Sequence, residues 1–137
     1  MSLTRLALLY VFTTVVFFAV DLVWLSTATK RIYEPHIGHL LSSSPKLAVA
    51  AGFYLLYVVG VLALASIPGL REGALAGALW RGALLGLLAY GTYDLTNLAT
   101  LEGWAWQITV IDLIWGTAVT SLTATVGYFV GRWLGLG

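Results

Sequence analysis

Residues 6–27 read LALLYVFTTVVFFAVDLVWLST, an apolar stretch bounded by Arg5 on one side and by Lys30 and Arg31 on the other. A helix needs about 20 mostly apolar residues to cross the hydrocarbon core of a bilayer, so this stretch is long enough. It nevertheless carries Asp21, and an ionisable residue within a span is costly and suggests a function by default. The stretch therefore predicts a membrane-spanning helix that holds part of a site.

The chain as a whole has the composition of a membrane protein. Of its 137 residues, 60% are hydrophobic and only 9% are charged, which lies outside the range of ordinary soluble domains. The absence of cysteine excludes disulfides, thiolate metal sites and cysteine nucleophiles. A formal net charge of +1, with Lys and Arg residues scattered along the chain, offers no basic surface for nucleic acid.

Three more apolar blocks follow the first, each bounded by charge or by Gly and Pro. We expect helices at about 6–27, 47–67, 77–99 and 104–130. These lengths suit helices and not the short alternating segments of a membrane barrel. The predicted fold is therefore all-α, a single transmembrane domain over residues 1–137 that forms an integral membrane four-helix bundle.

Two stretches share the pattern Asp-Leu-x-x-Leu-x-Thr, at 21–27 and at 94–100. One interpretation is a parallel duplication of a two-helix unit, as found in transporters. The other is chance, because short matches arise easily in a chain rich in leucine. Small residues at every fourth position also predict close packing of the third and fourth helices, or a face that forms a homo-oligomer.

All three aspartates of the chain fall within the expected helices. Asp21 and Asp94 lie near the ends of the first and third helices, and Asp112 lies near the beginning of the fourth, which runs the opposite way. At a rise of about 1.5 Å per residue, each aspartate should lie one to two turns below the same surface. The sequence thus predicts one layer of carboxyl groups near one face of the bilayer.

Helical spacing brings aromatic and polar side chains to these acids. Trp24 and Trp115 each follow an aspartate by three residues, where an indole can line a pocket or donate its N–H to a carboxylate. Hydroxyl and amide groups of the second and third helices can satisfy carboxylates that are cut off from water. The expected residues of a ligand-binding or proton-binding site are Asp21, Asp94, Asp112, Trp24, Trp115, Asn97, Tyr90, Tyr93 and Tyr57, with Tyr54 beside Tyr57.

No Lys or Arg lies at the depth of the aspartates, so salt bridges within one chain cannot neutralise all three. Some of the carboxyl groups must then be protonated, hydrated or bound to a cation, and clustered carboxylates titrate as a coupled group. A divalent metal held by oxygen atoms is a further interpretation. His36 and His39 could add to such a site if their link forms a helical turn, although Pro35 and Gly38 favour a loop. We assign no cofactor.

The second half of the chain carries a run of motifs at 93–100, then Gly103-Trp104, Asp112 and Trp115-Gly116-Thr117. These motifs, with Asp21 and Trp24, resemble a family of small bacterial predicted membrane proteins catalogued as a domain of unknown function. The resemblance extends over the whole chain. It implies a four-helix protein of the bacterial inner membrane and no established activity.

The basic residues give a prediction of orientation. With four spans, both termini share a side with Arg5, Arg71, Arg81 and Arg132, against Lys30, Arg31 and Lys46 on the other side. By the positive-inside rule, four against three favours cytoplasmic termini.

The sequence leaves three functions open. The first is the binding of protons, a cation or a small polar solute from one face, for transport by an oligomer. The second is a membrane-embedded enzyme that acts on a lipid, isoprenoid or quinone, with one aspartate as general acid or base and Tyr90 or Tyr93 orienting the substrate. The third is an accessory subunit of a membrane complex, whose acids pair with basic residues of a partner helix.

Overall fold

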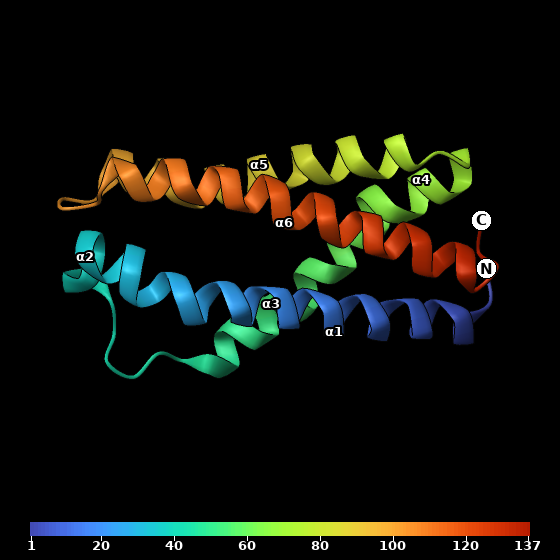
Figure 1. The fold of residues 1–137 in the computed structure, drawn as a ribbon, viewed down its shortest axis with the longest axis horizontal. Coiled ribbons are helices and arrows are strands. Elements are labelled where there is room, and N and C mark those ends of the chain that lie inside the picture. The colour runs from blue at the N-terminus through green and yellow to red at the C-terminus, as the bar shows by residue number, and fades with distance from the viewer.

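The computed structural model describes all 137 residues, and it contains helices and no strands. Four long helical segments follow one another along the chain, and together they confirm the predicted all-α four-helix fold (Figure 1). The first segment comprises α1 (Leu3–Ala28), the π-helix η1 (Thr29–Tyr33), α2 (Glu34–Ile37) and the 3-10 turn η2 (Gly38–Leu40). The second segment comprises α3 (Leu47–Val61), the π-helix η3 (Leu62–Ser66) and α4 (Ile67–Glu72). The third and fourth segments are α5 (Leu75–Thr100) and α6 (Trp106–Trp133).

Three of these segments are long and apolar enough to cross a membrane, namely Leu3–Leu40, Leu47–Glu72 and Trp106–Trp133. The remaining helix, α5, has 26 residues but is less apolar, because it includes Arg81, Asp94 and Asn97. Its length alone would suffice for a span. The crossing predicted for residues 77–99 therefore stays a prediction, although the helix itself is present.

The first segment differs from the sequence-based expectation. The sequence predicts a first helix that ends at about residue 27, with a loop around Pro35 and Gly38, yet the chain stays helical from Leu3 to Leu40 over 38 residues. Pro35 is tolerated because it lies in the first turn of α2, directly after the π-helix, where a missing N–H breaks little of the helical ladder. Asp21 consequently lies in the middle of a long helix and not near the end of a short one.

Three of the helical segments run along the long axis of the molecule, whereas α3 and α4 cross it obliquely (Figure 1). Both chain termini lie at one end, and α2 and the link between α5 and α6 lie at the other. Because α3 approaches α1 and α6 through its aromatic positions, it closes the bundle at mid-length. The aspartates lie between this mid-length crossing and the end that holds α2, on α1, α5 and α6.

Close backbone contact joins α5 and α6, as the small residues of these helices predict. A Cβ atom at Gly86 would overlap the backbone of Gly116 and come within 2.8 Å of the Thr120 side chain. One at Gly82 would come within 2.7 Å of the Ala124 Cβ atom. Glycine at these positions is therefore required for the distance between the two helices.

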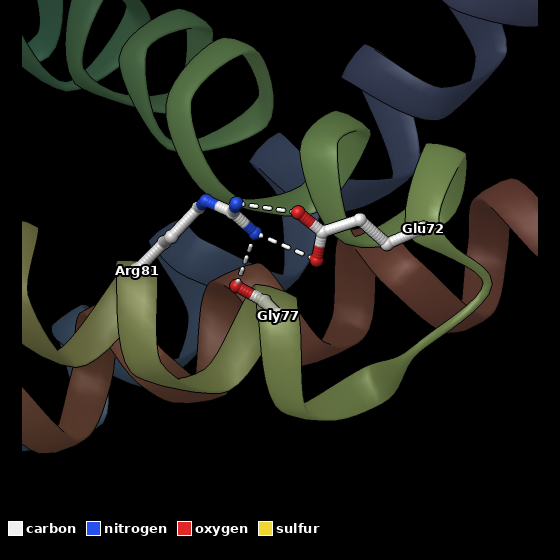
Figure 2. Close-up of polar contacts among 3 residues, drawn as sticks. All are labelled: Glu72, Gly77 and Arg81. Atoms are coloured by element: carbon white, nitrogen blue, oxygen red, sulfur yellow. Dashed lines mark hydrogen bonds and ion pairs between the residues drawn. The ribbon is translucent and has the colours of Figure 1, made fainter.

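The turn between α4 and α5 is fixed by a bidentate ion pair (Figure 2). The guanidinium of Arg81 donates to the two carboxylate oxygens of Glu72 over 2.5 and 3.0 Å, and one of its nitrogens also donates to the Gly77 carbonyl over 3.2 Å. Gly73 ends α4 in the left-handed region at φ 66°, a conformation that favours glycine. These contacts hold the second segment against α5 at the end of the molecule that carries the termini.

The α5–α6 contact predicts the effect of one methyl group. We expect Gly86→Ala to lower the free energy of unfolding by about 1–3 kcal/mol, because the new Cβ would push two backbones apart. Thermal unfolding in detergent, followed by circular dichroism, measures the change. The matched control is Gly52→Ala in α3, where a Cβ would have no neighbour within 4 Å. Equal stability of the two variants would contradict the packing described here.

Candidate functional site

A cavity of about 470 Å³ lies among α1, η1, α3, α5 and α6. All three aspartates line it, and their exposed fractions are 3% for Asp21, 0% for Asp94 and 7% for Asp112. Helices far apart in sequence thus bring every aspartate of the chain to one enclosed space. The cavity lies within the range of small-molecule sites in proteins, roughly 300–1,000 Å³.

Two of the aspartates are each held by a tyrosine. The Tyr33 hydroxyl of η1 donates to Asp112 Oδ1 over 2.5 Å, and the Tyr54 hydroxyl of α3 donates to Asp21 Oδ2. Hydrogen bonds to an ionised acceptor are stronger than neutral ones. The two tyrosines therefore fix the positions of these carboxyl groups and link the first, second and fourth helical segments around the cavity.

Asp94 has no such partner. Both of its carboxyl oxygens are buried without any hydrogen bond, although the side chain is fully enclosed. The Asp94 and Asp112 carboxyl groups lie close enough for each to affect the electrostatics of the other. An unsatisfied buried polar group costs free energy, more so when charged. Asp94 is therefore the side chain in the cavity that most needs something to bind.

The two tryptophans expected near the aspartates stack on each other. The rings of Trp24 and Trp115 are nearly parallel, at 9°, with centroids 4.4 Å apart. The Trp24 indole N–H donates to the Tyr33 hydroxyl over 3.1 Å, which extends a chain of hydrogen bonds to Asp112. The Trp115 indole N–H is buried and has no partner. The pair also borders a smaller groove between α1 and α6, so it separates the cavity from that groove.

Aromatic side chains dominate the lining. Nine of the fourteen lining residues are aromatic, and five of these are tyrosines. The aromatic residues are Phe17, Trp24, Tyr33, Phe53, Tyr54, Tyr57, Tyr90, Tyr93 and Trp115. Apart from the three aspartates, the remaining lining is Leu25 and Ala89, so no basic side chain reaches the cavity.

The cavity has one side that is open and one that is closed. Three of its lining residues are exposed, Leu25 on α1, Phe53 on α3 and Tyr93 on α5, and they mark its mouth. Toward the chain termini, tightly packed apolar side chains fill the space between the helices, among them Leu9, Val58, Val61, Leu62, Ala65, Val119 and Ala124. The cavity is therefore open where these three residues lie, and packed side chains fill the bundle beyond it.

Eight of the nine expected site residues line the cavity, and Asn97 does not. Asn97 lies next to Tyr93, one turn beyond Asp94 on α5. Tyr33 was not among the expected residues, although it holds Asp112. The only signal for it would have been a helix that continues past Lys30 and Arg31. Roles for all of these residues in binding stay predictions.

The histidines are placed apart from the aspartates. The His36 ring nitrogen Nδ1 lies 2.7 Å from the Ile32 carbonyl, as in a hydrogen bond, and His39 packs against Gly103 in the link between α5 and α6. No three His, Asp or Glu side chains are grouped closely enough to hold a metal ion. The structure thus does not bring the two imidazoles and the carboxylates into one site.

A short tether fixes the backbone of Asp94. The Trp104 indole N–H donates to Thr109 Oγ1 over 3.0 Å, and the Thr109 hydroxyl donates to the Asp94 carbonyl over 3.3 Å. Trp104 also packs edge-on against the Tyr93 ring, with centroids 5.7 Å apart. The link between the two helices is therefore ordered around the site.

Comparison with known families gives one match. The model of a family described as predicted membrane protein (DUF2177) matches residues 6–129, which include every residue of the cavity. The chain belongs to this family. DUF2177 proteins are membrane proteins of unknown function. No curated protein and no solved structure matches the chain.

The unequal partners of the aspartates predict opposite effects on stability. We expect Asp94→Asn to raise the free energy of unfolding by about 1 kcal/mol, because an amide can donate to the adjacent Asp112. Tyr33→Phe should lower it by about 1–3 kcal/mol, because Asp112 loses its donor. Chemical unfolding in detergent at neutral pH measures both, and Glu102→Gln, at an exposed residue, is the control without effect. A loss of stability in Asp94→Asn would make Asp94 a structural residue.

Proposed function

We propose that this DUF2177 protein binds a cation at Asp21, Asp94 and Asp112 in exchange for protons, as part of transport across the bacterial inner membrane. One observation carries the proposal. Asp94 is fully buried with both carboxyl oxygens unpartnered, beside a second carboxyl group, in a cavity that no basic residue reaches.

Electrostatics explain why a cation completes this arrangement. Two neighbouring carboxyl groups in an apolar cavity cannot both stay ionised without a positive partner. A proton supplies that charge when the site holds no solute. A bound cation supplies it instead, and the proton leaves through the mouth of the cavity. The exchange keeps the charge of the site constant, which is the requirement for coupling a solute to protons.

The hydrogen bonds of the other two aspartates support the same role. Tyr33 and Tyr54 keep Asp112 and Asp21 in place whether or not a solute is bound. The side chains that line the site therefore do not need to rearrange at each exchange. A preformed site loses less free energy to ordering when it binds. The free acceptor oxygens are then those of Asp94.

Transport requires a second access route, because packed apolar side chains close the cavity on the side of the termini. We propose a homo-oligomer as the transporting unit, in which a second copy allows α3 and α4 to move relative to the other helices. Both termini lie at the end opposite α2 and the link between α5 and α6 (Figure 1). With cytoplasmic termini, the mouth faces the outer half of the membrane.

A second candidate is an enzyme that acts on a lipid-borne substrate. The observation that favours it is the mouth of the cavity, whose exposed residues Leu25, Phe53 and Tyr93 are apolar or aromatic. A lipid, isoprenoid or quinone could enter between the helices, and Asp94 would act as general acid or base. In this case binding depends on an uncharged substrate, and cations do not displace protons.

The release of protons separates the two candidates. Purified protein in a weakly buffered detergent solution is mixed with sodium, potassium, magnesium or phenyltrimethylammonium chloride, and the pH change is recorded. We expect at least one cation to release protons in a saturable manner. Asp94→Asn should abolish the release, because the titrating pair becomes a single carboxyl group.

Glu102→Gln provides the matched control, because it also removes one acid, but from the exposed link between α5 and α6. It should release as many protons as the wild type. Absence of release with every cation would overturn the proposed exchange. Retention of a lipid or quinone that is lost in Asp94→Asn would then favour the enzyme.

A further inference from the structure

We infer that the cation is a hydrophobic organic ammonium ion, held by Asp94 and Asp112 within a cage of aromatic rings. This inference rests on the proposed exchange of a cation for protons and names the chemical class of the solute. It depends on four features of the cavity: its rings, the separation of its acids, its size and its mouth.

The rings form a connected aromatic wall. Phe17 contacts Tyr54 and Tyr57 with centroids 5.2 and 5.9 Å apart, and Tyr57 contacts Phe53 and Tyr90 at 5.7 and 6.4 Å. Most of these contacts are edge-to-face or tilted, so neighbouring rings face different directions. The face of an aromatic ring attracts an ammonium ion, most strongly where water is excluded. Such a wall suits a cation with an apolar body.

The acids are arranged poorly for a bare metal ion. All three line the cavity, but no three acidic or histidine side chains are close enough to hold a metal ion together. One oxygen of Asp21 and one of Asp112 already accept a tyrosine hydroxyl. Calcium takes 6–8 oxygen ligands and magnesium demands a near-octahedral set, whereas an ammonium ion is satisfied by one or two carboxylates and the ring faces.

Asp94 is the point where the positive charge binds. It is 0% exposed, it lines the cavity, and both of its oxygens lack a partner. The neighbouring Asp112 adds a second negative charge. A buried carboxyl group in the cavity wall that no hydrogen-bond donor reaches is the second observation, beyond the acidic cluster itself, that indicates a ligand.

Size and access fit the same class. The volume of about 470 Å³ is far larger than an inorganic ion needs and lies in the range for small organic ligands. The mouth is lined by Leu25, Phe53 and Tyr93, which carry no charge. A strongly hydrated ion would have to shed its water against these side chains, whereas an ammonium ion with an apolar body buries apolar surface as it passes them.

Matched probes separate the contribution of the ligand's charge to its affinity from the contribution of its shape. Phenyltrimethylammonium and tert-butylbenzene share one shape and differ in charge, and tetramethylammonium keeps the charge without the ring. Isothermal titration calorimetry of the full-length protein in detergent measures the affinity for each, together with potassium and magnesium. We expect phenyltrimethylammonium to bind roughly tenfold more tightly than the other probes, and Asp94→Asn to remove this preference.

Two variants at the mouth test the aromatic cage without threatening the fold. Phe53→Leu and Tyr93→Leu change residues that are 55% and 60% exposed, and each keeps an apolar side chain while it removes a ring. Each should weaken phenyltrimethylammonium binding several-fold. The control is Phe129→Leu on α6, which is 54% exposed and does not line the cavity.

The possible results distinguish the organic cation, the proton exchange and the aromatic cage from one another. Proton release by potassium or magnesium without binding of phenyltrimethylammonium would overturn the organic cation and leave the proposed exchange intact. Equal binding of tert-butylbenzene, unaffected by Asp94→Asn, would overturn the organic cation, and absence of proton release with every cation would overturn the exchange as well. Binding of phenyltrimethylammonium that tolerates both mouth variants would overturn the aromatic cage.

Discussion

The contact between the backbones of α5 and α6 is the constraint on which the site depends. Gly86 lies directly against Gly116, and the Tyr90 ring covers the place where a side chain at Gly116 would stand. With the helices this close, Asp94 and Asp112 face each other across the interface. A larger residue at either glycine would separate the two carboxyl groups. The packing of small residues between the helices therefore determines whether these carboxyl groups can act together.

Burying three carboxyl groups in one cavity costs free energy, and hydrogen bonds from the rest of the fold offset this cost only in part. Tyr33 and Tyr54 each donate to one aspartate, and the stacked Trp24 and Trp115 rings hold Tyr33 in place through one further hydrogen bond. The third aspartate, Asp94, receives no hydrogen bond at either carboxyl oxygen. Buried polar groups are normally satisfied in folded proteins, and residues that break this rule are often found where a protein binds its ligand. The unequal hydrogen bonding of three identical side chains is the observation that supports the proposed binding site over a purely structural network.

Much of this architecture follows from the sequence. The length of the apolar blocks determines helices, because a bilayer leaves no other way to satisfy the backbone. Spacing along each helix then places Trp24 beside Asp21, and Trp115 beside Asp112. The antiparallel course of the third and fourth helices brings Asp94 and Asp112 to one level. Local periodicity and chain direction carry this information, and neither requires knowledge of the packed structure.

Other features were decided by tertiary structure. The π-helix at Thr29–Tyr33 extends the first segment past Lys30 and Arg31 and brings Tyr33 to Asp112, although 79 residues separate the two in sequence. The parallel stacking of Trp24 on Trp115, the tether from Trp104 to Asp94 and the exclusion of Asn97 likewise depend on how whole helices meet. The sequence by itself determined that three acids lie in apolar helices with aromatic neighbours. Only the tertiary structure decided which acid is left without a partner, because hydrogen bonds between distant helices depend on their distance and rotation and not on local spacing.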